Sequence, residues 1–167
     1  LMDGRVININ PILRFFLVNF FICPLRSFPS AKLYKQVWDK ELGSPLLHNT
    51  MKLTERLQSK LPNYQVEFAM RYQNPSIEDV LNKILANNPD ELIVLPLFPQ
   101  YAAATTGSVY EEVSRIISKK WVVPKINFIN QFYDNEKFID AWVEKAEEFD
   151  IDSYDKVIFS YHGVPNS

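Results

Sequence analysis

From residue 65 onward, two kinds of hydrophobic pattern alternate along the chain. Short, nearly continuous apolar runs are typical of buried strands, and they predict strands over 65–70, 91–98, 125–130 and 156–160. Between these runs, apolar residues recur at helical spacing, which predicts helices over 76–88, 108–120 and 135–149. Ser76 is the expected N-cap of the first of these helices, because Asp79 follows it at capping-box spacing.

This alternation predicts an α/β fold. Parallel strands need crossover connections, usually helices, so we expect a three-layer parallel sheet flanked by helices, which is a Rossmann-like arrangement. The first 60 residues instead predict helical segments over 10–22, 30–41 and 46–61. A doubly wound domain usually opens with a strand, and Leu1 is an unusual first residue, so we expect the start of the chain to be truncated.

The most apolar stretch of the chain is NPILRFFLVNFFICPL, residues 10–25. Arg14 and Asn19 interrupt it and Pro24 closes it, so it falls short of the roughly 20 apolar residues of a bilayer span. The favoured interpretation is a helix that is buried on one side or faces a partner. A helix that rests on a membrane surface is the alternative.

Composition narrows the function classes. A length of 167 residues is enough for one domain with a sizeable core. The net charge of −2, with scattered Lys and Arg, argues against a nucleic-acid surface. The single cysteine, Cys23, excludes an internal disulfide framework and an all-cysteine metal cage. The chain has no GxxxxGK[ST], GxGxxG, HExxH or CxxC motif and no serine elbow, which disfavours nucleotide binding and several hydrolase types.

Aromatic and polar residues follow every predicted strand, at 71–74, 96–108, 130–135 and 161–163. Ligands of open parallel sheets bind beyond the carboxyl ends of the strands, so these segments are expected to meet around one site. Their phenols, amides, hydroxyls and imidazole predict an aromatic-walled cleft with a polar rim. Such a cleft would suit a large flat ligand.

Several of these residues also have an ordinary structural explanation. His162 could be a satisfied loop histidine, and spacing alone does not decide between this interpretation and a functional one. Residues 101–108 could be only a loop and a helix start. Tyr34 lies at helical spacing from Trp38, as core residues do, and Arg26 could be an exposed loop residue.

Four segments carry a resemblance to a known family: GSPLL (43–47), MRYQNPSIEDVL (70–81), PLFPQYAAATTGSVYEEV (96–113) and FSYHGVP (159–165). In this order they resemble diagnostic segments of bacterial ferrochelatases. Residues 2–38 also look like the amino-terminal region of that family. The resemblance covers essentially the whole chain, and the third and fourth segments are specific in combination.

The resemblance implies a lyase of haem biosynthesis that inserts ferrous iron into protoporphyrin IX, or in some bacteria coproporphyrin III. The family fold has two Rossmann-like halves with the porphyrin between them. Residues 1–167 would then be the amino-terminal domain of a chelatase, without the first strand and without the carboxy-terminal half. We expect the fragment alone to be inactive.

The resemblance also implies site residues. His162 matches the family's active-site histidine, either as metal ligand or as proton acceptor, because a neutral imidazole near pH 7 can do both. A glutamate of the second half would face it. Together, the matched positions and the aromatic wall predict that porphyrin is bound by Arg26, Tyr34, Ser44, Arg71, Tyr72, Tyr101 and Tyr161.

No cofactor is expected beyond the substrate iron, since Cys23 alone cannot hold an iron–sulfur cluster. The expected partners are protoporphyrin IX and ferrous iron, and no nucleic acid. A cytoplasmic location is expected, with peripheral membrane contact left open. Two other classes also stay open: a non-catalytic tetrapyrrole-binding module, and a chelatase that inserts cobalt or nickel into another tetrapyrrole.

Overall fold

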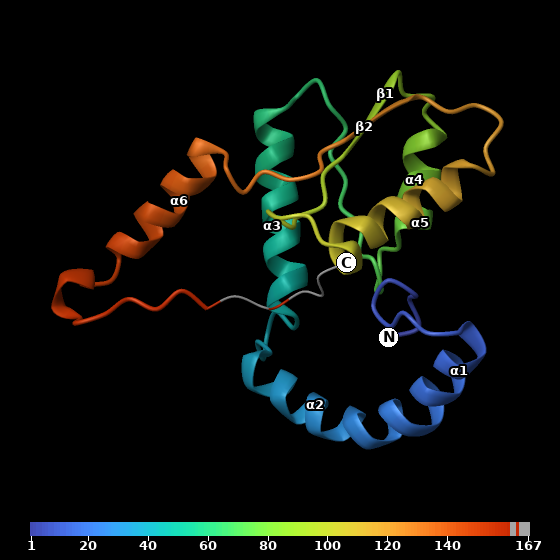
Figure 1. Cartoon of the computed structure of the whole chain (residues 1–167). Helices are drawn as coiled ribbons and strands as arrows, with labels where there is room; N and C mark the ends of the chain where they lie inside the picture. Colours follow the sequence, from blue (N-terminus) through green and yellow to red (C-terminus); the bar gives the residue numbers. More distant parts are fainter. Residues whose placement is uncertain (161–162, 164–167) are drawn as a thin grey trace.

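The computed structural model describes residues 1–160 and 163, so Tyr161 and His162 lie outside the described residues. Helices make up most of the regular secondary structure of the described residues (Figure 1). In chain order the elements are α1 (Pro11–Phe16), η1 (Leu17–Ile22), α2 (Cys23–Val37), α3 (Pro45–Lys60), α4 (Ile77–Leu85), β1 (Glu91–Val94), η2 (Ala103–Gly107), α5 (Ser108–Ile117), β2 (Lys125–Phe128), α6 (Glu136–Glu147) and η3 (Ile151–Ser153).

The sheet of the described residues consists of β1 and β2, which pair in parallel. Leu92 lies opposite Ile126, and Val94 lies opposite Phe128. Side chains alternate between the faces of a strand, so these four point to the same face. The connection between the two strands runs through η2 and α5, as a parallel pair requires.

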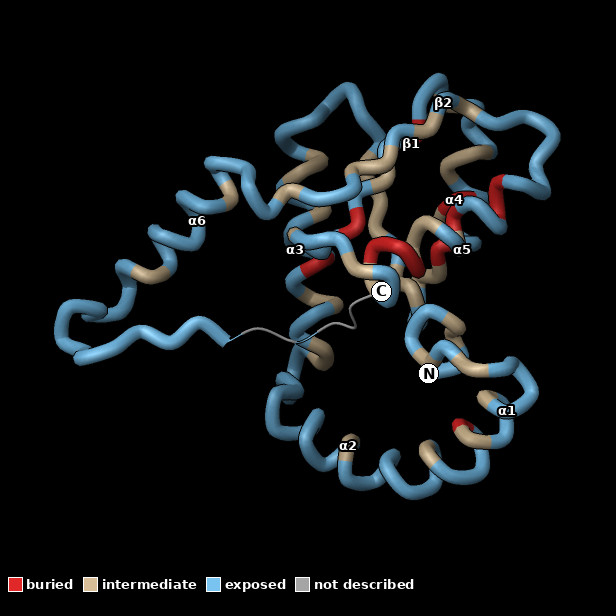
Figure 2. Tube along the Cα trace, viewed as in Figure 1, coloured by how far each residue is buried: buried red, intermediate tan, exposed pale blue. Residues whose placement is uncertain are grey.

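The core lies between this face of the sheet and the helices α4 and α5. Its buried residues come from α4, β1 and α5: Ile77, Leu81, Leu92, Val113, Ile116 and Ile117. Partly buried apolar residues of both strands and both helices complete it. Figure 2 shows that buried positions gather here, whereas α2 and α6 carry none. The predicted apolar faces of the helices over 76–88 and 108–120 are therefore confirmed.

The other face of the sheet is only loosely covered. Figure 1 shows α3 on that side and α4 and α5 on the opposite side. Leu95 and Ile129 line a groove together with Leu53 and Leu57 of α3. Ile93 and Leu95 nevertheless stay exposed, so this helix does not cover the face completely.

The ends of the helices follow local signals. The Ser76 hydroxyl accepts a hydrogen bond from the Asp79 N–H at 3.1 Å, which confirms the predicted N-cap of α4. Asn135 caps α6 in the same way through Lys137. The helices α4, α5 and α6 each end two or three residues before their predicted ends. After α4, Asn88 adopts φ 48°, a left-handed conformation that stops a helix.

Two predicted strands are not part of the sheet. Residues 65–70 have no strand partner and form only an isolated bridge between Met70 and Ser76. Their polar groups bond to helices instead: the Val66 N–H donates to Gln58 of α3, and Glu67 accepts from Lys83 of α4. Residues 156–160 are exposed and unpaired as well. An apolar run becomes a strand only beside a partner edge, which neither segment has in this part of the chain.

The amino-terminal apolar segment also differs from the prediction. The helix does not end before Pro24 but runs from Pro11 to Val37, with a π-helical turn, η1, directly before Cys23. The wider turn and the place of Pro24 in the first turn of α2 let the chain continue as a helix. By length and composition alone this helix could cross a membrane, contrary to the expectation from residues 10–25.

The predicted burial of one side of this segment within the chain is wrong for the described residues, and the partner-facing alternative stays a prediction. Only 6% of the most apolar window of the Pro11–Val37 helix is buried. The exposed apolar side chains include Ile12, Leu13, Phe16, Phe20, Phe21, Leu25, Phe28 and Leu33. The described part of the chain has no second layer that packs against them.

We predict that Leu92→Ala lowers the free energy of unfolding by about 2–5 kcal/mol, because it leaves a cavity in the only buried apolar cluster of the described residues. The matched control is Ile93→Ala on the other face of the same strand, which should cost about 1 kcal/mol or less. Urea titration followed by circular dichroism measures both. Equal losses would contradict the location of the core.

Candidate functional site

A buried carboxylate joins three distant parts of the chain. The Oδ2 atom of Asp3 accepts hydrogen bonds from the Ser108 hydroxyl at 2.5 Å, the Tyr72 hydroxyl at 2.9 Å and the Arg71 Nη2 atom at 2.9 Å. Its Oδ1 atom accepts from the Arg5 backbone N–H at 2.8 Å. The Asp3 side chain is only 7% exposed. We call Asp3, Arg71, Tyr72 and Ser108 the Asp3 cluster.

The one cation of the cluster, Arg71, and its one aromatic ring, Tyr72, are both held by contacts within it. The Arg71 Nε atom donates to the Ser108 hydroxyl at 2.8 Å and to the Ser108 carbonyl at 3.2 Å. The Arg71 guanidinium also lies 4.7 Å from the centre of the Tyr72 ring, a cation–π distance. Tyr72 as a whole is 60% exposed. The cluster therefore fixes the phenol oxygen while it leaves much of the residue open.

Burial and neighbouring groups shift the pKa values of both Asp3 and Tyr72. Burial raises the pKa of Asp3, but the hydrogen bonds from Ser108, the Arg5 N–H and Tyr72, together with the Arg71 charge, lower it to about 2. The pKa of Tyr72 is raised, first by burial and then by its bond to Asp3. Near neutral pH the cluster thus consists of a carboxylate, a guanidinium and a neutral phenol.

Tyr101 lies beside this cluster at the start of α5. A Cβ atom at Gly107 would come within 3.0 Å of the Tyr101 hydroxyl and 3.1 Å of the Arg5 guanidinium. Glycine is therefore the residue that lets both groups approach the backbone here. Arg5 forms an ion pair with Glu111 of α5, which is a second connection between the amino terminus and this helix.

The other predicted porphyrin-binding residues lie elsewhere. Ser44 is the N-cap of α3, where its hydroxyl accepts from the Leu47 N–H at 3.4 Å. Arg26 and Tyr34 project from α2 and are exposed. Among the described residues, no hydrogen bond or ion pair joins these three to the Asp3 cluster. The structure therefore gathers Arg71, Tyr72 and Tyr101 near the start of α5 and leaves the α2 residues apart.

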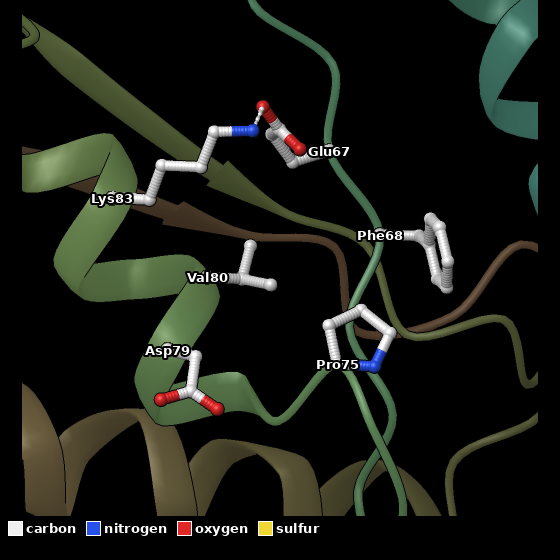
Figure 3. A pocket seen from close by; sticks show the side chains of 6 residues that line it. All are labelled: Glu67, Phe68, Pro75, Asp79, Val80 and Lys83. Carbon is white, nitrogen blue, oxygen red and sulfur yellow. Dashed lines mark hydrogen bonds and ion pairs between the residues drawn. The ribbon is translucent and has the colours of Figure 1, made fainter.

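Two hollows lie near the sheet. A groove of about 950 Å³ opens beyond the carboxyl ends of β1 and β2, between α3 and the start of α6, and is lined by Leu53, Leu57, Leu95, Leu97, Ile129, Gln131, Phe132, Asp134, Asn135, Glu136 and Lys137. As expected, the segments that follow these two strands meet. A smaller hollow of about 290 Å³ lies beside α4, where Lys83 binds Glu67 next to Phe68 and Pro75 (Figure 3).

The sequence did not reveal the contact between Asp3 and Ser108. In the sequence, Ser108 stands out only as part of the segment 101–108 that could be a loop and a helix start, and Asp3 does not stand out at all. Their bond spans 105 positions, and the bond between Asp3 and Arg71 spans 68. No periodicity or spacing marks partners so far apart. Within the described residues, no group of three or more His, Cys, Asp or Glu side chains is arranged to hold a metal ion.

Comparison with known proteins matches the ferrochelatase family over residues 1–167. The chain therefore belongs to the ferrochelatase family. It is 43% identical over 169 aligned positions to the ferrochelatase of Francisella tularensis subsp. novicida (strain U112) and 44% identical to that of subsp. holarctica (strain OSU18). Each alignment covers 99% of this chain and 51% of the relative, so the chain spans about half the length of these curated relatives.

The low pKa of Asp3 predicts a pH-dependent stability. Because the pKa falls from 3.8 to about 2 on folding, the ionised carboxylate stabilises the fold above about pH 4, by about 2 kcal/mol, and this contribution is lost as the pH falls through 2. Asp3→Asn should therefore be less stable than the wild type at pH 6. The gap should shrink between pH 4 and pH 2 in urea titrations. A gap that stays constant over this range would contradict the low pKa.

Proposed function

We propose that this chain is the amino-terminal half of a ferrochelatase that inserts ferrous iron into protoporphyrin IX to form protohaem. The observation that carries this proposal is the family match over all 167 residues, supported by 43% identity to a named ferrochelatase. Coproporphyrin III is the alternative substrate. The two porphyrins differ in the number of carboxylates, so the residues that bind propionates decide between them.

The chemistry requires two groups at the ring centre. Two pyrrole protons must leave the porphyrin, and a desolvated ferrous ion must reach its nitrogen atoms. His162 is proposed to take part, either by accepting a proton or by binding the metal, since a neutral imidazole suits both tasks. A glutamate in the second half of the enzyme is proposed to face it. No other cofactor is proposed, and Cys23 alone would not hold an iron–sulfur cluster.

The porphyrin is proposed to lie against one wall made of aromatic rings. Tyr72 and Tyr101 are exposed near the start of α5 and can offer ring faces to a flat ligand. Arg26, Tyr34 and Ser44 are proposed to bind propionates. Arg26 offers a guanidinium that matches a carboxylate in geometry, and Ser44 keeps its hydroxyl proton to donate while its oxygen caps α3. Tyr161 is proposed to complete the wall.

The fold favours a larger sheet domain in the intact enzyme than the two-stranded sheet of the described residues. We propose that the intact enzyme has a three-layer, Rossmann-like half-domain around this sheet, with a first strand that this chain lacks. Three features favour this: residues 65–70 are extended but unpaired, Ile93 and Leu95 are exposed on one face, and β1 and β2 already form a parallel pair. A central parallel sheet covered on both faces would use all three.

Peripheral contact with a membrane is proposed for the Pro11–Val37 helix. Its exposed apolar side chains would be buried among acyl chains, and it has four basic residues and no acidic one, so it favours anionic lipids: Arg14, Arg26, Lys32 and Lys35. The proposed location is the cytoplasmic face of a membrane. This contact would bring an apolar porphyrin close to the wall described above.

The activity test compares this chain alone with a protein that also contains the second half of the site. We predict that the 167-residue chain alone does not form haem, because half of the porphyrin would stay in water and no facing carboxylate would complete the site. A chimaera in which this chain replaces the matching half of the F. tularensis ferrochelatase should insert iron. His162→Ala should abolish that activity and leave the fold intact.

Loss of porphyrin fluorescence under anaerobic conditions with ferrous iron measures the reaction. Cobalt and nickel in separate reactions test the related chelatases. A chimaera that folds and binds porphyrin but inserts no iron would contradict the proposed function. Haem formation by the chain alone would contradict the need for a second wall, and normal turnover by His162→Ala would contradict the proposed role of the histidine.

The membrane proposal predicts binding to vesicles that contain anionic lipid. Phe20→Ser with Phe21→Ser should weaken this binding at least about tenfold, because two exposed aromatic side chains no longer enter the acyl region. The matched control is Trp142→Ser with Phe149→Ser, which removes two exposed aromatics in or near α6. Sedimentation with vesicles measures both. Equal losses, or no binding by the wild type, would contradict the proposal.

A further inference from the structure

The Asp3 carboxylate fills the place that a substrate carboxylate would take between Arg71 and Tyr72. One oxygen atom of Asp3 accepts from Arg71, Tyr72 and Ser108 at the same time, all within 2.9 Å. The Asp3 side chain is 7% exposed, so the carboxylate is enclosed by these donors. A porphyrin propionate could reach the same donors only if it displaced Asp3.

The charges of the cluster are already matched. Asp3 neutralises the Arg71 guanidinium, and the Arg71 Nε atom is used by Ser108. A second carboxylate would have to compete with a partner that belongs to the same chain and loses no translational freedom on binding. The arrangement therefore does not favour a role for Arg71 as a direct propionate ligand.

The ring of Tyr72 is the part of the cluster that remains available. Its hydroxyl is held by Asp3 and lies 3.2 Å from the Ser108 hydroxyl, while the Arg71 guanidinium lies over its ring. These contacts fix the phenol at its oxygen and at one face. A ring that is held before the ligand arrives loses less conformational freedom when a flat aromatic ligand packs against it.

We propose that Asp3 is a positioning residue for porphyrin binding: it holds Arg71 and Tyr72 so that the open face of the Tyr72 ring forms part of the porphyrin wall. This inference rests on the proposed function. It gives Tyr72 the direct contact and gives Asp3 and Arg71 a supporting role. It also predicts a dependence of porphyrin affinity on a residue at the amino terminus, far from His162 in the sequence.

The chain contains a matched control for the alternative that Asp3 acts only by attaching the amino terminus to α5. Arg5 binds Glu111, so this ion pair also joins the amino terminus to α5. Both of its side chains are exposed, and among the described residues no hydrogen bond or ion pair joins either of them to Tyr72 or Arg71. Glu111→Gln therefore weakens the tether and leaves the orientation of the ring unchanged, whereas Asp3→Asn removes the charge that orients the ring.

The experiment measures the dissociation constant of protoporphyrin IX by fluorescence, on the 167-residue chain and on the chimaera. Circular dichroism first establishes a temperature at which every variant is folded. Asp3→Asn should weaken binding about tenfold, the factor that corresponds to about 1.4 kcal/mol. Glu111→Gln should change the constant less than about twofold. In the chimaera, KM for porphyrin should rise in Asp3→Asn while kcat changes little.

A double-mutant cycle tests whether the effect passes through the ring. Tyr72→Phe keeps the ring but removes the hydroxyl that binds Asp3, so Asp3→Asn should add little to its effect. Fully additive losses would overturn the inference, as would an equal loss in Glu111→Gln. Tighter porphyrin binding by Asp3→Asn would also overturn it, because Asp3 would then compete with a propionate. Absence of porphyrin binding by the parent proteins would instead overturn the proposed function, and the inference with it.

Discussion

The carboxylate of Asp3 connects parts of the molecule that lie far apart in the sequence. It joins the amino-terminal turn to the segment after residues 65–70 and to the first residue of α5. A buried carboxylate is costly unless charged and polar donors surround it, so the cluster is stable only when all three parts are in place. Together with the Arg5–Glu111 ion pair, this cluster attaches the amino-terminal turn, and the long α1–α2 helix that follows it, to the sheet layer.

Local patterns predicted the helices and strands whose partners lie nearby in the sequence. The faces of α4 and α5, the cap at Ser76 and the pair β1–β2 all follow from periodicity and short-range signals. Residues 65–70 and 156–160 carry the same apolar signal, but a strand also needs a neighbouring edge, and a single sequence does not reveal which edges are free. The Asp3 cluster was not predictable for a related reason, since its partners lie 68 to 105 positions away and leave no repeating pattern. The long helix was misjudged at Pro24, because a proline that follows a π-helical turn does not end the helix.

Exposed apolar surface dominates the parts that do not belong to the core. The Pro11–Val37 helix exposes nearly all of its aromatic and aliphatic side chains, and one face of the sheet leaves Ile93 and Leu95 open. Monomeric soluble proteins rarely leave contiguous patches of this kind uncovered. The basic character of the helix favours an anionic membrane for the first patch. The second patch belongs to a parallel sheet, and parallel sheets normally have both faces covered by further layers of protein. This patch therefore favours a protein partner. The helix therefore favours a membrane as its partner, and the sheet face favours a further layer of protein. The latter agrees with the chain's span of about half the length of its curated relatives.

These features also bear on how a flat ligand would be recognised. A macrocycle gains binding energy from ring faces only if the rings are already oriented, since ordering loose side chains opposes binding. Within the described residues, the Tyr72 hydroxyl is held by Asp3 and the Tyr101 hydroxyl lies beside Gly107, whereas Tyr34 and Arg26 stand exposed on α2. The hydrogen-bonded part of the proposed porphyrin wall thus lies at the start of α5, and the more exposed part lies on the apolar helix. Such a site would bind the porphyrin ring system at the start of α5. The porphyrin propionates would be bound firmly only when the α2 helix is itself immobilised, for example by a membrane. Porphyrin binding and the environment of the helix would then be coupled, because both act on the same exposed side chains.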